Sequence, residues 1–403
     1  MRPDDLPRFR QSPTDPVFMA DPYPAYERLR ALGPVAFWEE LGKPVLCGHA
    51  EVSAVLRDRR FGREVTHLAS REALGWAPIP ERLAPFHAFE AHSLLEREPP
   101  VHTRLRRLVN RAFTSRALAG LGPRIEGLAE ELIDGFSSEA ELMEGFATPI
   151  PLTVIAELLG APIEAGPQML AWSHDMVGMY QAGRGRAEEN RAVAATEAFS
   201  SFAQRRRRPG EVLIDALIAA EDPAAEGGGR LSEPELVATC ILLLNAGHEA
   251  TVHAIGNAVR LVVERDLDRA AFGGRGGERA ADEGLRVDPP LHLFSRYALG
   301  EVEVAGLRLR LGEEVGLLLA AANRDPLAFP DPARADLLRP GAERHVSLGA
   351  GLHFCVGAPL ARLEIRSALA VLFRRLPDLR LAQAPRRSNR WHFHGHDTLR
   401  IAT

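Results

Sequence analysis

The stretch that most constrains the fold runs from residue 231 to residue 266, "LSEPELVATCILLLNAGHEATVHAIGNAVRLVVERD". Its spacing is helical and its middle is apolar on all sides, which for a globular protein predicts a helix that runs through the core. Ser232 is the expected N-cap, and Glu235 is its expected capping-box partner. The rest of the chain is therefore expected to pack around one long buried helix.

Helical spacing also dominates elsewhere, and strand-like segments are few. Amphipathic helices are predicted across residues 102–159, and a pair of helices at 161–180 and 187–208. Residues 62–100 have weak periodicity, which predicts loop with short helices. Strands are predicted within residues 34–39, 43–48, 296–309 and 313–320. The predicted fold class is mainly α, with small β-sheets near both ends of the chain.

Composition limits the partners and the compartment. The chain has 403 residues, 46% hydrophobic and 26% charged, with a formal net charge of -5, which argues against nucleic acid or an acidic membrane as the main partner. We find no signal peptide and no apolar run of about 18 residues, so we expect no membrane-spanning helix. The scattered cysteines, Cys47, Cys240 and Cys355, lack metal-type spacing and indicate a reducing, cytoplasmic environment.

Cys355 lies in an unusual loop, "HVSLGAGLHFCVGAPLARLE", directly before a helix-like run. The free N–H groups and the dipole at a helix N-terminus favour a thiolate, which is the form that acts as nucleophile or metal ligand. Gly349, Gly351 and Gly357 permit positive φ angles and the close approach of a planar group. For an isolated cysteine, a buried core position beside a tight turn is the commoner interpretation, and the surrounding residues decide between the two.

Three further patterns carry polar groups that could bind or react. Glu283 and Arg286 in "DEGLR" lie on one helical face, and so do His102 and Arg106 in "VHTRLRRL". Alone, each pattern fits an ordinary solvated helix face. Glu249 lies in the apolar middle of the long helix, where a carboxylate is costly without a partner or a function.

Together these patterns resemble the cytochrome P-450 superfamily, from about Asp21 to the C-terminus. The family's haem-ligand loop reads F-x-x-G-x-H-x-C-x-G, and Gly351, His353, Cys355 and Gly357 match it. The family's phenylalanine is Leu348 here, which implies a different sulfur environment and redox potential. The resemblance implies haem b, iron protoporphyrin IX, as cofactor, with the Cys355 thiolate as its axial metal ligand.

The resemblance also gives roles to the other proximal residues. Glu283 and Arg286 match the family's E-x-x-R and are implied to form a buried structural pair, completed by Arg339 or His345. Loss of either partner is then expected to impair haem incorporation, because it leaves a buried charge unpaired. The side chains implied to hold the haem propionates are His102, Arg106, Arg296 and His353.

The long helix matches the family's oxygen-side pattern A-G-x-[DE]-T-[TS] with one departure. Ala246, Gly247 and Glu249 match, but Ala250 occupies the position of the proton-relay threonine, and Thr251 follows it. Either Thr251 takes over the relay, or an ordered water or a substrate hydroxyl does. The Thr251 hydroxyl could instead only bond the carbonyl of Gly247, one turn earlier.

The family fold is a helical prism around the haem with a long central distal helix, and it implies one domain over residues 1–403. We expect an N-terminal β-rich part (21–65), a substrate-access loop region (66–100) and a helix-rich haem-binding part (101–403). The expected substrate pocket for a small or medium organic molecule comprises Phe86, Phe89, Leu243, Ala246, Leu291, His292, Leu293 and Phe393, with His392 and His394 as further polar candidates.

The implied activity is that of a monooxygenase that inserts one oxygen atom from O2 into its substrate. Electrons are expected from an external ferredoxin and its NAD(P)H-dependent reductase, since the chain has no flavin or nicotinamide fingerprint, and a monomer is expected. Candidate docking residues are Arg104, Arg107, Arg362 and Arg366, which fit ordinary solubilising arginines equally well. The alternatives are a peroxide-driven peroxygenase, suggested by Ala250, a non-catalytic haem sensor or ligand carrier, and a helical interaction protein without haem.

Overall fold

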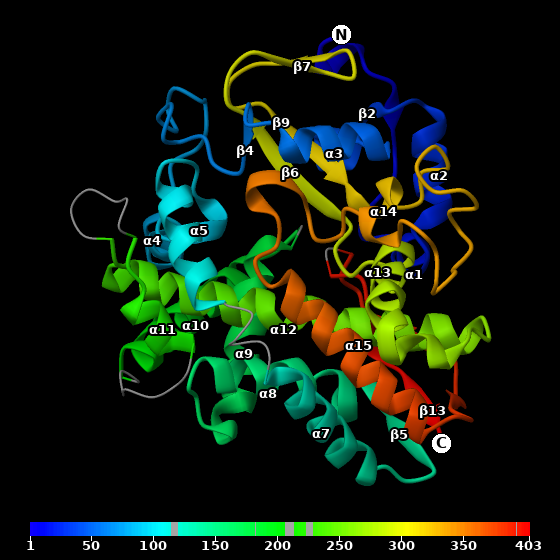
Figure 1. The fold of residues 1–403 in the computed structure, drawn as a ribbon. Coiled ribbons are helices and arrows are strands. Elements are labelled where there is room, and N and C mark those ends of the chain that lie inside the picture. The colour runs from blue at the N-terminus through cyan, green and yellow to red at the C-terminus, as the bar shows by residue number, and fades with distance from the viewer. Residues whose placement is uncertain (114–119, 182, 206–212, 223–228, 392) are drawn as a thin grey trace. The chain divides into compact units, whose positions relative to one another are not determined.

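The computed structural model describes the chain except for five short segments, and its elements are drawn in Figure 1. The described residues are 1–113, 120–181, 183–205, 213–222, 229–391 and 393–403. They form two compact units. The sheet unit contains Met1–Ser70, Ile125–Thr148 and Ala250–Thr403, and the helical unit contains Arg71–Arg124 and Pro149–Glu249. The expectation of a single domain stays a prediction.

The sheet unit contains a six-stranded mixed sheet. Its strands are β1 Arg8–Phe9, β2 Val35–Trp38, β3 Lys43–Leu46, β4 Phe61–Gly62, β6 Leu293–Ala298 and β9 Glu314–Leu318. Their order is β1-β2-β3-β9-β6-β4, with β3 and β9 parallel and Leu46 opposite Leu317. The sequence predicts β2, β3, β6 and β9 but not β1 and β4, and the structure joins all six in one sheet. Apolar spacing identifies a strand but not its partner, so this pairing was not predicted.

Both faces of this sheet are buried. Successive residues of a strand point to opposite faces, so Val45 and Leu46 pack in two different apolar clusters. Helix α2 (Tyr23–Ala31) contributes to the cluster of Val45, and helix α3 (His49–Arg57) contributes to that of Leu46. Val346, at the start of the cysteine loop, also belongs to the Leu46 cluster. The loop is thus anchored on the core of the sheet.

The remaining elements of the sheet unit are short strands and helices. The strands form three small sheets, made of β5 Glu139–Glu141 with β10 Arg380–Leu381 and β13 Arg400–Ala402, of β7 Val302–Val304 with β8 Leu307–Leu309, and of β11 Arg386–Arg387 with β12 His396–Thr398. The main helices are α1 Pro16–Ala20, α13 Gly277–Val287, α14 Leu319–Ala322 and α15 Ala358–Arg375. Helices α13 and α15 lie side by side, and α15 directly follows the cysteine loop (Figure 1).

The described part of the helical unit is built from helices. They are α4 Ala84–Glu90, α5 Val101–Ala112, α8 Pro149–Leu158, α9 Gly166–Val177, α10 Arg186–Arg205 and α11 Leu213–Ala219. Helix α10 packs on α9 and on α4, and α11 packs on α5. The predicted helical pair corresponds to α9 and α10. The loop region with short helices before residue 101 is also confirmed.

Two helices continue from the helical unit into the sheet unit, α7 (Leu121–Asp134) and α12 (Glu233–Glu264). Helix α12 is the predicted long helix, and it is an uninterrupted α-helix. The Ser232 N–H donates to the Glu235 carboxylate at 2.8 Å, as the capping box predicts. Among the described residues, no helix has both the length and the apolar content needed to cross a membrane.

Candidate active site

The cysteine loop has the tight backbone that its glycines predict. Gly349 and Gly351 have φ angles of 70° and 68°, and the Cys355 N–H donates to the Leu348 carbonyl at 2.9 Å. Cys355 is half-buried just before α15. Gly357 does not use the positive φ that a glycine permits, since its φ is -83° at the N-cap of α15. Gly357 takes an ordinary conformation because it begins a helix instead of closing a turn.

Packing explains Gly351 more directly than room for a ligand does. A Cβ atom at Gly351 would lie 2.3 Å from the carbonyl oxygen of Leu56 and 2.8 Å from the Cα of Arg57, at the end of α3. At Gly357 an added Cβ would lie 3.9 Å from the Cys355 Sγ, an ordinary contact. The backbone at the end of α3 therefore approaches Gly351 so closely that a side chain would not fit there.

The three cysteines differ in their accessibility. Cys47 and Cys240 are buried, and burial raises the pKa of each thiol to about 12. Cys355 is half-buried. A thiolate is the form that binds a metal, so Cys355 is the cysteine best placed to bind one.

A buried ion-pair network supports the loop. Arg286 Nε lies 2.7 Å from a carboxylate oxygen of Glu283, both side chains are fully buried, and Arg339 Nε lies 3.1 Å from the other Glu283 oxygen. Arg286 also donates to the carbonyl of Asn323 at 2.9 Å. The Asn323 side chain accepts from the Val346 N–H at 2.8 Å. The pair thus connects α13 to the start of the cysteine loop.

His345, the other candidate for this network, pairs elsewhere. Its Nε2 lies 3.1 Å from Asp282 Oδ1, and Arg362 Nε lies 2.7 Å from the same oxygen. Burial acts to raise the pKa of Asp282, but the hydrogen bonds from His345 and Arg362 hold it below its ordinary value. Of the two predicted partners, Arg339 is therefore the one that completes the Glu283 pair.

The expected propionate partners lie in both units. Arg296, on β6, is 2% exposed and donates to the carbonyl of Ser295, while His353 is half-buried two residues before Cys355. His102 is buried and Arg106 half-buried, one turn apart on α5 of the helical unit.

Helix α12 has small residues at positions that are not fully buried. Ala246 is exposed and Ala250 is half-buried, although most of their neighbours on the helix are buried. These two positions are one turn apart and share a face. At Gly247 an added Cβ would lie 3.1 Å from the Ile155 side chain, so this glycine allows α8 to approach closely.

Thr251 lies beside a second buried acid that the sequence analysis missed. Glu364, on α15, is 1% exposed, and burial raises the pKa of its carboxyl well above the ordinary value, with the Thr251 hydroxyl opposing the shift. Burial therefore favours the neutral form of this carboxyl. The signal in the sequence is an acid on the apolar face of the helix that follows Cys355.

Glu249 lies between two histidines in the helical unit. Its Oε2 is 3.1 Å from Nε2 of His174 on α9 and 3.5 Å from Nε2 of His248. Glu249 is 3% exposed. His174 was missed because it belongs to another helix, and helical spacing does not reveal which helices face each other.

The expected substrate-pocket residues separate into different surroundings. Phe86 is 1% exposed and packs with Leu83 and Met179, while Phe89 meets it edge to face at 5.1 Å. Leu243 is buried, and Leu293 is half-buried. These placements assign Phe86 to a small apolar core.

His292 is not available as a pocket residue, which corrects the prediction. It is fully buried, with Nδ1 2.7 Å from the Tyr26 hydroxyl and Nε2 3.1 Å from the Pro289 carbonyl. Adjacent residues of an extended chain point in opposite directions, so His292 points away from the side of Leu291. Leu291 forms a β-bridge with Phe393. His394 is also a buried structural group, and His392 lies outside the described residues.

Most of the arginines proposed for docking are engaged within the chain. Arg104 pairs with Glu235, Arg107 lies 3.0 Å from Asp222, and Arg362 pairs with Asp282 as described above. Arg366 is half-buried. These pairs reduce the positive charge that the first three offer to an acidic partner.

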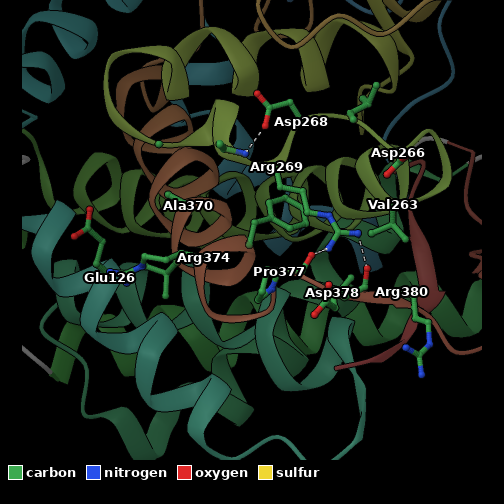
Figure 2. A pocket seen from close by; sticks show the side chains of 16 residues that line it. Glu126, Val263, Asp266, Asp268, Arg269, Ala370, Arg374, Pro377, Asp378 and Arg380 are labelled. Atoms are coloured by element: carbon green, nitrogen blue, oxygen red, sulfur yellow. Dashed lines mark hydrogen bonds between the residues drawn. The ribbon is translucent and has the colours of Figure 1, made fainter.

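A cavity of about 1190 Å³ lies elsewhere in the sheet unit, and Figure 2 shows its lining. It is bordered by the C-terminal parts of α12 and α15 and contains no predicted site residue. Arg269 crosses it to donate to the Leu379 carbonyl at 2.7 Å, and acidic and basic side chains alternate around it. Its open, mixed-charge lining distinguishes it from an apolar substrate pocket.

Comparisons with known proteins identify the family. The cytochrome P450 family model matches residues 278–385. The cytochrome P450 monooxygenase PikC of Streptomyces venezuelae is 36% identical over 91% of this chain and 87% of its own. The vitamin D(3) 25-hydroxylase of Pseudonocardia autotrophica is 37% identical, over 91% of this chain and 89% of its own. The chain belongs to the cytochrome P450 superfamily.

Solved structures give the same result for the fold of this P450. The ligand-free structure of Mycobacterium smegmatis CYP164A2 is 36% identical, has a TM-score of 0.83, and the match covers 97% of this chain and 98% of that one. The mainly α fold class with small sheets is therefore confirmed, and the chain is a cytochrome P450 monooxygenase. The family implies a haem-thiolate cofactor and the use of O2.

The residues of the chain fit such a cofactor. Cys355 offers a half-buried thiol at the start of a helix, Arg296 offers a buried cation, and Ala250 is a small, half-buried residue on α12. A thiol ligand and a cation for a carboxylate are what an iron porphyrin with propionates needs.

Proposed function

We propose that this P450 inserts one oxygen atom from O2 into a small or medium-sized organic substrate, with electrons from a ferredoxin and its NAD(P)H-dependent reductase. The observation that carries the proposal is Cys355, a half-buried thiol in a loop anchored by a fully buried ion pair. Bacterial relatives that are named monooxygenases and hydroxylases support it.

The proposed cofactor is haem b with the Cys355 thiolate as axial ligand. When bound, it supplies the oxygen chemistry, because an axial thiolate pushes electron density toward iron and favours O–O cleavage. His102, Arg106, Arg296 and His353 are proposed to hold the propionates. Glu283, Arg286 and Arg339 are proposed to keep the loop in a conformation that accepts the haem.

Two acids are proposed to supply protons near α12. Glu249 carries them from the side of His174, which is partly exposed to solvent. Thr251 and Glu364, whose neutral form is favoured by burial, are proposed as a second donor pair, in place of the relay threonine that Ala250 replaces. A neutral carboxylic acid next to a hydroxyl can donate and recover a proton, as general acid catalysis requires.

The proposed substrate is an apolar organic molecule of small or medium size. Two relatives are named as a vitamin D(3) 25-hydroxylase and a 6-deoxyerythronolide B hydroxylase. Leu243, Leu291, Leu293 and Phe393 remain candidates for the lining, whereas Phe86 and His292 have packing roles.

The proposal is tested by the spectrum of the reduced carbon monoxide complex. The wild-type protein is expected to give the red-shifted Soret band of thiolate-ligated haem, and Cys355→Ala is expected to lose it. Cys47→Ala, which removes a buried thiol, is the matched control and should keep the band. A Cys355→Ala protein with an unchanged band would overturn the proposal.

A peroxygenase is the second candidate, because Ala250 replaces the family's relay threonine. Hydrogen peroxide brings its own protons and electrons, so this route needs neither a relay nor a ferredoxin. Turnover with ferredoxin, reductase and NAD(P)H is compared with turnover with peroxide. Product formation with peroxide alone would replace the leading proposal with this one.

A further inference from the structure

Two histidines and Glu249 form a cluster of three side chains in the helical unit. His174 comes from α9, and His248 and Glu249 come from α12. Glu249 Oε2 lies 3.1 Å from His174 Nε2 and 3.5 Å from His248 Nε2. One donor atom from each of the three residues lies within 4.8 Å of the others. Three potential metal ligands thus converge on one point.

The tautomer of His248 makes this convergence informative. Its Nδ1 lies 2.9 Å from the Leu244 carbonyl, and a carbonyl only accepts, so the hydrogen of the neutral ring is on Nδ1. Nε2 then carries a lone pair, is buried, and has no hydrogen-bond partner among the residues described. This lone pair faces a carboxylate oxygen, and two acceptors at this distance repel each other unless a cation lies between them.

The geometry suits a tetrahedral transition-metal ion. Zinc binds histidine nitrogen and carboxylate oxygen at about 2.0–2.2 Å, which places two tetrahedral ligand atoms about 3.3 Å apart. The two distances to Glu249 bracket this value. Two imidazoles exclude calcium and magnesium, which prefer oxygen ligands. The carbonyl of Leu244 holds His248 as outer partners usually hold metal-binding histidines.

Access to the cluster comes through His174. Its side chain is 44% exposed, whereas those of His248 and Glu249 are 1% and 4% exposed. An ion can therefore arrive from solvent at His174 and keep a water as its fourth ligand, as open zinc sites do. The two buried ligands are already in place on α12 and need little ordering.

We propose that His174, His248 and Glu249 bind one divalent transition-metal ion, with zinc as the best fit. Binding engages the carboxylate that we assign to proton supply, so zinc is expected to inhibit turnover. This consequence rests on the proposed function, whereas the binding itself does not. Zinc binding is therefore measured directly, without an activity assay.

The test is calorimetric titration of zinc chloride into untagged, haem-loaded protein from which metals have been removed by a chelator. The wild-type protein is expected to bind one equivalent of zinc at this site, more tightly than it binds zinc anywhere else. His174→Ala is expected to weaken this site at least about tenfold, since even the loss of an outer-shell partner typically costs that much. His174 is exposed, so this variant should fold normally.

His87→Ala is the matched control. His87 Nδ1 lies 2.8 Å from Glu90 Oε2 on α4, which gives a histidine–carboxylate pair without a third ligand. This variant should bind zinc as the wild type does. Glu249→Gln, which keeps the shape and removes the charge, should also lose affinity. The proposal is overturned if no single strong site is found, if His174→Ala binds as the wild type does, or if His87→Ala loses the same affinity.

Discussion

Two buried groups of histidine and carboxylate in this P450 have similar composition and different surroundings. One is the cluster around Glu249, and the other is Asp288 with His292 and His394 in the sheet unit. In the second group, Arg260 and Arg387 each lie 2.8 Å from Asp288 Oδ2, and the Tyr23 hydroxyl donates to Oδ1 at 3.1 Å. Arg260 and Arg387 thus already supply the positive charge that balances the Asp288 carboxylate.

The histidines of the Asp288 group are also engaged. His292 binds Tyr26 and the Pro289 carbonyl through its two nitrogens. His394 Nε2 lies 3.2 Å from the Met19 carbonyl, and its Nδ1 lies 3.4 Å from Asp288 Oδ1 without a hydrogen bond. Burial acts to raise the pKa of Asp288, but the arginines and His394 hold it well below its ordinary value. The comparison shows that residue types alone do not define a metal site. The partners of each nitrogen and oxygen decide between a structural network and a binding site.

The largest expected effect is the loss of stability in Asp288→Asn. Asp288 is 1% exposed, and its removal leaves Arg260 and Arg387 without their shared counter-ion. Breaking a buried pair from one side typically costs about 3–5 kcal/mol in the free energy of unfolding. Urea denaturation measures this cost.

The control for this variant is Asp397→Asn, which removes a looser pair with Arg386, at 3.7 Å, between partly exposed side chains. Such pairs contribute about 0–1 kcal/mol. Equal losses in the two variants would show that the Asp288 group is not the structural network described above.

The next effect is on turnover and concerns the other group. Glu249→Gln removes the proposed proton carrier, and loss of a general acid typically lowers the rate about 100-fold or more. The expected loss appears in turnover supported by ferredoxin and reductase. A smaller loss is expected with hydrogen peroxide, which brings protons with the oxygen. Equal losses by both routes would mean that Glu249 acts on folding or haem binding instead.

A third effect is the pH dependence of stability in the Asp288 group. Burial lowers the pKa of His292 well below 6.5 and that of neighbouring His396 to about 2. Below about pH 6.5 the unfolded chain therefore binds protons that the folded chain does not. The free energy of unfolding consequently decreases as the pH is lowered. Each such histidine contributes about 1.4 kcal/mol per pH unit.

His292→Gln tests this dependence. When the pH is lowered from 6.5 to 5, the free energy of unfolding of this variant should decrease by about 2 kcal/mol less than that of the wild type. Denaturation curves at several pH values give the comparison. A His292→Gln slope equal to that of the wild type would place this ring in its charged form.

The sequence predicted best those features that depend on neighbours in the chain. The Cys355 loop and the spacing of Glu283 and Arg286 are local, because i and i+3 share a helical face wherever the helix packs. The burial of that pair followed from the family resemblance, which left its completion open between Arg339 and His345, and the structure selects Arg339. The longer strands β2, β3, β6 and β9, the β7–β8 pair and most helices were found from their periods, whereas the short strands β1, β4, β5 and β10 to β13 were not.

What the sequence could not provide depends on packing between distant segments. Nothing near His174 indicates that α9 brings it to Glu249, and nothing near Thr251 indicates Glu364 on α15. The same holds for Gly351, whose neighbour is the end of α3, and for the pairing of β3 with β9. These contacts arise from long-range packing, which periodicity does not encode.

The smallest expected effect is on the stability of His174→Ala, and it separates the two groups most directly. The side chain is 44% exposed and adds little to the core. Exposed substitutions usually change the free energy of unfolding by less than about 0.5 kcal/mol. A small loss of stability together with a large loss of zinc affinity would identify a binding site. If stability fell as far as in Asp288→Asn, His174 would instead belong to a structural network of the same kind, and the contrast between the two groups would disappear.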